Sequence, residues 1–171
     1  MELSRLLPPS HLIMNLRGDS PETIIRTLCQ PLADEGAITD LDAFVTKVLE
    51  REQIYTTQIL ENVAFPHAHA EQVRTISLVI GHTGPEGITF APNTPGKCRL
   101  FFLIAVPASA PEAHLELMAN LVDLVMSSKL QELLDAHSPE QILNLIAEYC
   151  PTHVHDVPLP RRPPQGPHPL L

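Results

Sequence analysis

Residues 100–106 have the sequence Leu-Phe-Phe-Leu-Ile-Ala-Val, in which every side chain is apolar. Successive side chains of a strand point to opposite faces, so a strand of this composition has to be buried on both faces. The run has the length of a buried strand and falls well short of the about 20 apolar residues that span a membrane. It therefore predicts the central strand of a sheet that is covered by helices.

Shorter apolar segments before this run are predicted to join it in the same sheet. Residues 11–17, 63–65 and 75–80 each have the length and composition of a strand. Gly18 follows the first of them and Gly81 the third, and glycine commonly interrupts regular structure.

Helices are expected where apolar residues recur at helical spacing after a capping residue. The predicted helix starts lie at four capping residues, which are Ser20, Thr39, Ser109 and Ser138. The helices are expected over about residues 21–35, 40–52, 112–126 and 129–135, and from 139 onward. The order of strand, two helices, further strands and then helices predicts a single α/β domain, with a mixed sheet flanked by helices on both faces.

The composition argues against several classes of protein. The chain has 171 residues and a formal net charge of -9, whereas nucleic-acid binders normally carry a basic face. The first five residues, Met-Glu-Leu-Ser-Arg, lack the layout of a signal peptide, and no apolar run is long enough for membrane insertion. We therefore expect a cytoplasmic protein with no nucleic-acid partner.

The cysteines and prolines are informative about chemistry and domain limits. Cys29, Cys98 and Cys150 are odd in number and not closely paired, so buried reduced thiols are expected rather than disulfides. Seven of the 18 prolines lie beyond residue 150, in a segment with little to bury. Residues 1–150 are therefore predicted to form the domain, and residues 151–171 a proline-rich, disordered tail.

Among the nine histidines, His67 has the most suggestive position. It follows Pro66 at the predicted end of a strand, and open α/β sheets place ligand sites at the carboxyl ends of their strands. Histidine can form a covalent intermediate or bind a metal ion. His69 would share one face of an extended backbone with His67, although two histidines are too few for an ordinary metal site. A nucleophile, a metal ligand and a structural histidine all remain possible on these grounds.

A series of motifs around His67 resembles the active-site signature of a known family. Arg51-Glu52 is followed by Thr57, ten residues before His67, and then by Ala64-Phe65-Pro66-His67. Further matching motifs follow in order, at Glu86-Gly87-Ile88-Thr89-Phe90, Leu103-Ile104-Ala105-Val106-Pro107, His114-Leu115 and Ser138-Pro139-Glu140. Over about residues 10–148 the chain resembles the fructose–mannitol type (type 2) of enzyme IIA domains of the bacterial sugar phosphotransferase system.

The resemblance implies a protein-histidine phosphotransferase that needs no cofactor and no metal. His67 would accept a phosphoryl group from the histidine phosphocarrier protein and pass it to a cysteine of enzyme IIB during sugar uptake. Docking to both partners would use a largely apolar rim that includes three side chains, Phe65, Ile88 and Phe90.

The resemblance also implies roles for three residues beside His67. Arg51 offers a forked cationic donor that suits phosphate. His114 lies at a predicted helix start, where anions are favoured, and would bind the phosphate or hold the reactive tautomer of His67. Thr57 would donate its hydroxyl to the phosphate or to the ring of His67, or cap a turn.

Two alternative functions are compatible with the same residues. One is a regulatory, nitrogen-type enzyme IIA that acts as a phosphorylation-dependent binding partner of regulatory protein targets. The other is a non-phosphorylated interaction domain of the same fold. Leu60 and Asn62 stand where the family usually has glycines, and because leucine disfavours a left-handed backbone, the loop before His67 is expected to be reshaped.

Overall fold

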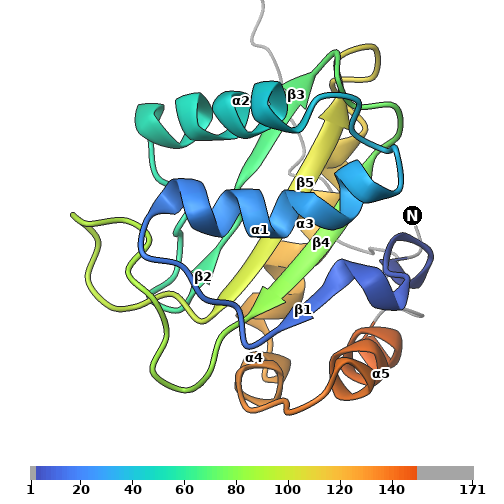
Figure 1. The fold of residues 1–171 in the computed structure, drawn as a ribbon. Helices are drawn as coiled ribbons and strands as arrows, with labels where there is room; N and C mark the ends of the chain where they lie inside the picture. Colours follow the sequence, from blue (N-terminus) through green and yellow to red (C-terminus); the bar gives the residue numbers. More distant parts are fainter. Residues whose placement is uncertain (1–2, 150–171) are drawn as a thin grey trace, which may run out of the picture.

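Strand β5 (Leu100–Pro107) runs through the middle of a five-stranded mixed sheet, and all of its residues are buried (Figure 1). The structure is a computed structural model and describes residues 3–149. Strand β4 (Ser77–His82) pairs with β5 in antiparallel fashion, and β1 (Leu12–Met14) pairs with the outer edge of β4 in parallel. The predicted central strand is confirmed.

Two short strands share the other edge of β5. Both β2 (Val63–Ala64) and β3 (His67–Ala70) run parallel to β5, and the Pro66 carbonyl between them accepts the N–H of Ile104 at 3.0 Å. His67 is therefore the first residue of β3, opposite Ile104, and does not end a strand as the sequence suggested. Pro66 interrupts the strand because proline has no N–H to donate to the ladder. Its carbonyl still accepts a hydrogen bond from β5, and the strand continues at His67.

Helices cover both faces of the sheet, as predicted. Figure 1 shows α1 (Pro21–Asp34) and α2 (Leu41–Ile54) on one face. The other face is covered by α3 (His114–Met126), α4 (Lys129–Leu134) and α5 (Pro139–Tyr149). Two short 3-10 helices, at Leu3–Leu6 and Pro9–His11, precede β1.

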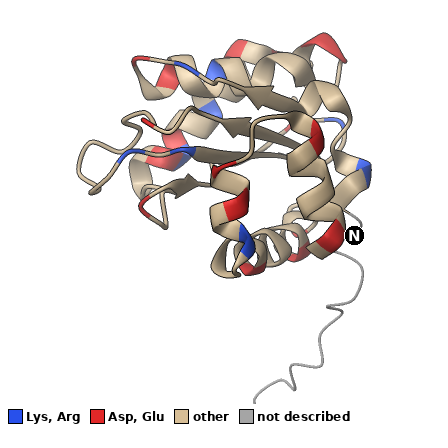
Figure 2. Ribbon diagram, turned by 90° about the horizontal axis from the view of Figure 1, so that it is seen from below, with Lys and Arg blue, Asp and Glu red and all other residues tan. Residues whose placement is uncertain are grey.

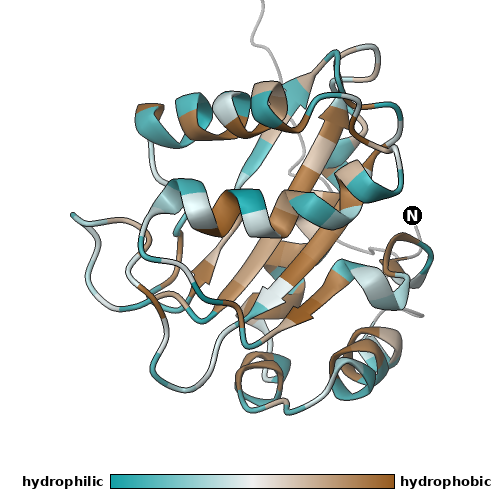
Figure 3. Ribbon diagram, in the orientation of Figure 1, coloured by the Kyte–Doolittle hydropathy of each residue, from teal (hydrophilic) through white to brown (hydrophobic). Residues whose placement is uncertain are grey.

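The alternation of side chains along β5 divides the interior into two cores. Phe101, Leu103 and Ala105 pack in the core with α1 and α2. The alternate residues, Leu100, Phe102, Ile104 and Val106, pack in the core with α3, α4 and α5. Figure 3 shows β4 and β5 as a band of hydrophobic residues between the two helical layers. Both faces of β5 are buried in a core, so neither face can carry polar side chains. This explains the apolar composition of residues 100–106.

Two of the predicted helix caps are confirmed. The Ser20 hydroxyl accepts the N–H of Thr23 at 3.2 Å, and Thr23 completes a reciprocal capping box with the backbone of Ser20. The Ser138 hydroxyl accepts the N–H of Gln141 at 3.2 Å at the start of α5. Each cap satisfies a backbone donor that the first turn of a helix leaves without an intrahelical partner.

The other two predicted caps are wrong. Helix α2 is capped by Asp40, whose carboxylate accepts the N–H of Ala43 at 3.0 Å, whereas the Thr39 hydroxyl donates to the Gln72 carbonyl at 3.3 Å. The capping box predicted at Ser109 does not form, because α3 begins only at His114 and its N-cap residue, Ala113, has no capping side chain.

The strand predicted to end at residue 80 continues to His82. His82 is the last residue of β4 and is buried. Its Nε2 lies 3.0 Å from the Leu133 carbonyl and 2.9 Å from the Leu134 carbonyl, so it serves the end of α4 as a structural histidine. Strand β1 is shorter than predicted, because Asn15 adopts a φ of 55° directly after it.

The expectation of buried thiols is confirmed for Cys29 and Cys98, which are free and buried. Cys150 and the predicted tail at 151–171 lie outside the described residues. Acidic residues are spread over the helices and loops of residues 3–149 (Figure 2). Within that range, none of the helices combines the length and the apolar character needed to cross a bilayer.

Candidate active site at His67

The sheet places His67 and His69 on the face that α3 covers. Ala68 and Ala70 alternate with them and are buried in the core with α1 and α2. His67 therefore shares its face with its register partner Ile104, which packs in the core on the α3 side. Small residues at 68 and 70 allow α2 to approach the strand closely, while the two imidazoles stay at the edge of the opposite face.

A backbone hydrogen bond fixes the protonation of the His67 ring. Its Nδ1 lies 2.8 Å from the carbonyl oxygen of Phe65. A carbonyl oxygen can only accept, so Nδ1 carries the hydrogen and, in the neutral ring, Nε2 keeps its lone pair. This tautomer leaves Nε2 as the nucleophilic nitrogen.

The surroundings of His67 favour the neutral ring. Burial is the largest cause, and it lowers the pKa of His67 below its ordinary value of 6.5. The hydrogen bond to the Phe65 carbonyl opposes this shift, and the positive charge of Arg51 and, when protonated, of His114 and His69 lowers the pKa further. The imidazole is consequently available as a nucleophile at neutral pH.

The loop before His67 is braced by Glu52, near the end of α2. The Glu52 carboxylate accepts the hydroxyl of Thr56 at 2.8 Å, and the N–H and hydroxyl of Thr57, both at 2.7 Å. The Thr57 carbonyl in turn accepts the N–H of Phe65 at 3.1 Å. A continuous set of contacts thus joins Glu52 to Thr57, Phe65 and the ring of His67. No separate role was predicted for Glu52 from the sequence, although two threonines four and five residues after a glutamate were the available signal.

Arg51 lies close enough to His67 for its charge to act on the ring, whereas Thr57 is buried in the loop before His67. Arg51 donates from Nη1 to the Tyr55 carbonyl at 3.0 Å, and its charge acts on His67. Thr57 is buried, and its hydroxyl is engaged by Glu52. The predicted direct contact of Thr57 with phosphate or with the His67 ring stays a prediction.

His114 completes the group of side chains near His67. Its ring lies 6.0 Å from that of His67, centroid to centroid, at an interplanar angle of 22°. On its other side, His69 lies edge-on to it, with a centroid distance of 4.5 Å and an angle of 81°. On the basis of the sequence, His69 was considered only as a metal ligand. Among residues 3–149, no three histidine, cysteine or acidic side chains are arranged to hold a metal ion.

Leu60 and Asn62 form their loop without left-handed backbone. Within the described residues, Asn15 is the single non-glycine residue with positive φ, so neither Leu60 nor Asn62 adopts the conformation that glycine would favour. The Asn62 carbonyl accepts the N–H groups of Arg99 at 2.8 Å and Leu100 at 3.0 Å. The loop is therefore tied to the start of β5 by ordinary backbone geometry.

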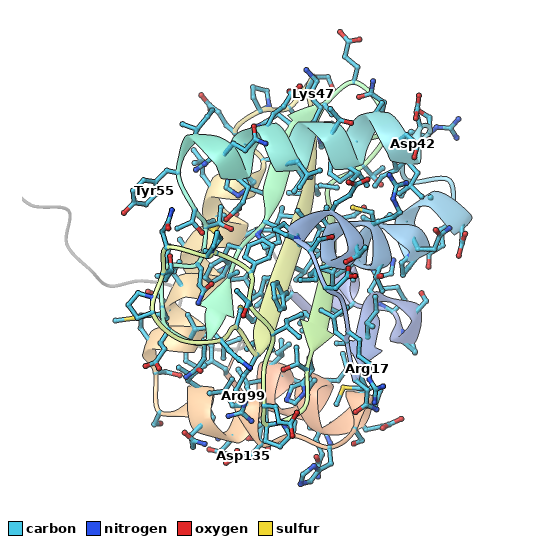
Figure 4. All side chains as sticks on the ribbon, turned by 60° about the vertical axis from the view of Figure 1, so that its left-hand side comes forward. Arg17, Asp42, Lys47, Tyr55, Arg99 and Asp135 are labelled. Atoms are coloured by element: carbon cyan, nitrogen blue, oxygen red, sulfur yellow. The ribbon has the colours of Figure 1, made fainter. Side chains whose placement is uncertain are left out.

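The structure corrects two of the three residues predicted for the apolar rim, whereas the third, Ile88, is half-buried. Phe65 and Phe90 are only 2% exposed and belong to the two cores, so neither is available for docking. Large apolar side chains are instead exposed at the end of α2, in the loop after it and at the start of α3: Ile54, Tyr55, Ile59 and Leu115. Figure 4 shows Tyr55 extending from the end of α2 away from the sheet.

A cleft of about 690 Å³ lies between the start of α1, the end of α2 and the loop at 90–94. Glu22, Glu52, Tyr55 and Phe90 are among its lining residues, and neither His67 nor His114 is among them. The histidine group lies outside this cleft, with His69 exposed and His67 and His114 half-buried.

The α/β architecture and the group of three histidines agree with the resemblance of the sequence to enzyme IIA domains, and comparison with known proteins shows the family. Residues 5–149 match the family described as "Phosphoenolpyruvate-dependent sugar phosphotransferase system, EIIA 2". The chain belongs to this family and is an EIIA domain of the fructose–mannitol type, with nitrogen-regulatory relatives.

Two relatives illustrate the range of proteins that carry this domain. The fructose-specific EIIA component of Haloferax volcanii is 28% identical over 148 residues, which are 86% of this chain and 96% of that protein. The fructose-specific EIIABC component of Bacillus subtilis is 27% identical over 150 residues, which are 87% of this chain and 24% of that protein. The chain thus spans about a quarter of the second relative and nearly all of the first.

Solved structures share the fold. The nitrogen regulatory protein IIA-Ntr of Neisseria meningitidis has a TM-score of 0.74 at 22% identity, covering 84% of this chain and 98% of that one. The mannitol enzyme IIA of Escherichia coli, solved as a complex with phosphorylated enzyme IIB, has a TM-score of 0.71 at 23% identity, covering 83% and 97%.

Proposed function

We propose that His67 is a phosphoacceptor, which takes a phosphoryl group from the histidine phosphocarrier protein and passes it to a cysteine of enzyme IIB. The observation that carries the proposal is the 2.8 Å hydrogen bond between Nδ1 of His67 and the Phe65 carbonyl. It assigns the hydrogen to one nitrogen and the lone pair to the other, which is the state that a nucleophilic imidazole requires.

The transfer is balanced without a change in the protonation of Nδ1. The Nε2 lone pair attacks phosphorus, an N–P bond forms on His67, and the bond between phosphorus and the donor histidine breaks. In the second step a cysteine thiolate of enzyme IIB attacks the same phosphorus, and the lone pair returns to Nε2. Throughout, Nδ1–H stays on the Phe65 carbonyl and holds the ring in place.

The remaining groups supply charge and position. Arg51 brings a fixed positive charge to the site, which favours the approach of a phosphoryl dianion. His114, at 6.0 Å between ring centroids, leaves room for phosphoryl oxygens beside His67 and offers a donor to them when protonated. Thr57 and Glu52 position the loop that ends in the Phe65 carbonyl.

Docking would use the exposed apolar side chains around this site, which we call the docking surface: Ile54, Tyr55, Ile59 and Leu115. Three of them lie on or next to the segment that carries Arg51, and Leu115 follows His114 directly. An apolar surface around a charged centre lets two proteins exclude water from the transferring group. The related mannitol enzyme IIA, solved with phosphorylated enzyme IIB, supports an enzyme IIB as the recipient here.

The test is phosphorylation in a reconstituted system. Incubation with phosphoenolpyruvate, enzyme I and the phosphocarrier is expected to add one acid-labile phosphate per chain, and His67→Ala is expected to abolish it. His137→Ala removes an exposed histidine away from the site and should be labelled like the wild type. Labelling that survives His67→Ala would contradict the proposal.

A regulatory role is the second candidate, and the similarity to IIA-Ntr favours it. In that role the phosphoryl group on His67 would control binding to a target protein. Pull-downs from cells with wild type and with His67→Glu separate the two roles. An enzyme IIB or permease as the captured partner supports transport, and a kinase or an ion transporter captured by only one of the two forms supports regulation.

A further inference from the structure

His69 and His114 meet at one backbone carbonyl. Nε2 of His69 lies 2.9 Å from the Pro111 oxygen, and Nδ1 of His114 lies 2.8 Å from the same oxygen. The two ring nitrogens are 3.2 Å apart. His69 comes from β3 and His114 from α3, so this carbonyl joins the strand of His67 to the helix on the same face.

The shared carbonyl determines where the hydrogens lie. The oxygen only accepts, and a nitrogen lone pair less than 3 Å from it would be repelled, so the network assigns a hydrogen to Nε2 of His69 and to Nδ1 of His114. The 3.2 Å approach of the two nitrogens is then a contact between two donors that converge on one acceptor. Nε2 is the His114 nitrogen that remains for a phosphoryl oxygen, to which it donates when the ring is protonated.

The turn before α3 is exposed, whereas the helix itself is anchored in the core from Leu117 onward. Its N-cap residue, Ala113, provides no capping side chain, and Pro111 is exposed. The backbone also ties this segment to β3 through the N–H of Ala108, which donates to the Ala70 carbonyl at 3.1 Å. His69 therefore adds a side-chain link between β3 and the exposed turn that carries His114.

We propose that His69 is a positioning residue for phosphoryl transfer, acting through His114. Its Nε2–H holds the Pro111 carbonyl, and its edge-on ring restricts rotation of the His114 ring, so that Nε2 of His114 keeps its place beside His67. The inference rests on the proposed phosphoacceptor role of His67. It assigns a function to a side chain that does not itself touch the phosphoryl group.

Two substitutions separate this role from simple packing. His69→Leu removes the donor but keeps an apolar side chain, whereas His69→Gln keeps an N–H that can reach the place of Nε2. Initial rates of phosphoryl transfer from the phosphorylated phosphocarrier are expected to fall about tenfold in His69→Leu, because loss of positioning commonly costs one to two orders of magnitude. His69→Gln should recover most of the rate. Circular dichroism and thermal melting verify that both variants are folded.

A spectroscopic measurement reads the His114 ring directly. Long-range ¹H–¹⁵N correlation spectra of the full chain, labelled at histidine, report the tautomer of each imidazole. At a pH where the rings are neutral, His114 is expected to be protonated at Nδ1 in the wild type and in His69→Gln, with a mixture of tautomers or exchange broadening in His69→Leu.

The outcomes distinguish this inference from the function on which it rests. If the wild type is not labelled at His67, the phosphoacceptor role fails, and the role of His69 with it. If the wild type is labelled but His69→Leu transfers at the wild-type rate, only the role of His69 is overturned. Equal slowing of the Leu and Gln variants with an unchanged His114 spectrum would overturn it as well, because the hydrogen bond would then not be the cause.

Discussion

The ring of His67 is held by its own loop, since its Nδ1–H donates to the carbonyl of Phe65 at 2.8 Å. The donor and the acceptor are only two residues apart, on either side of Pro66, which fixes the backbone between them. The hydrogen bond and the burial of the ring act together: one selects the tautomer, and the other favours the neutral state. Both effects expose the lone pair of Nε2.

The depressed pKa of His67 predicts how the site responds to pH. A base whose pKa is lowered stays neutral as the pH falls through 6.5, and it protonates only under more acidic conditions. In an NMR titration, the ring resonances of His67 should therefore have a midpoint below 6.5. A midpoint above 6.5 would contradict the environment described for the ring.

The Glu52 brace predicts a loss of stability when its acceptors are removed. Glu52→Ala leaves the buried Thr57 hydroxyl and N–H without their partner, at an expected cost of about 1–3 kcal/mol in the free energy of unfolding. Urea denaturation measures the change. Glu50→Ala, on the exposed side of the same helix, should change stability by no more than about 0.5 kcal/mol. Equal effects of the two substitutions would argue against the brace.

The docking surface predicts a change in affinity without a change in fold. Ile54 is 81% exposed, so Ile54→Ser should leave the thermal midpoint unchanged. Loss of one well-placed apolar contact costs about 1 kcal/mol, which corresponds to about a fivefold rise in KM for the phosphocarrier. Met126→Ser is the matched control, because Met126 is 67% exposed but lies at the far end of α3, about 18 Å along the helix from His114. A similar rise in KM for both variants would contradict the proposed location.

The buried thiols predict resistance to alkylation. Burial raises the pKa of Cys29 and of Cys98 to about 12, so almost no thiolate is present at pH 8. Peptide mapping after brief treatment with iodoacetamide should find both cysteines unmodified in the native protein and modified after denaturation. Rapid native alkylation of either one would show that its side of the sheet opens more readily than the packing indicates.

Much of the fold could be predicted because burial leaves a clear pattern in the sequence. Residues 100–106 had to lie between two cores, and the Ser20 and Ser138 caps follow directly from local backbone chemistry. The errors arose where tertiary contacts compete with local preference. Thr39 donates to Gln72, 33 residues away, and this leaves capping to Asp40. His82 is polar but extends β4, because its ring hydrogen-bonds to the carbonyl groups at the end of α4.

The candidate site was predicted less completely than the fold. His67, Arg51 and His114 were identified through their motifs, and the structure brings them together. The role of Glu52 was found only in the structure, although the two threonines that follow it were a signal in the sequence. The role proposed for His69 depends on the Pro111 carbonyl, which lies 42 residues away and comes close only in the fold. The apolar rim could not be chosen correctly from the sequence, since Phe65 and Ile54 are equally apolar and only packing decides which one is buried.

The proposed role of His67 is tested most directly by locating the phosphoryl group on the phosphorylated full chain. Long-range ¹H–¹⁵N correlation of histidine-labelled protein, before and after phosphorylation, identifies both the residue and the nitrogen. We expect a change at Nε2 of His67, with Nδ1 still protonated. Phosphorylation at Nδ1 of His67, or on any other residue, would contradict this expectation.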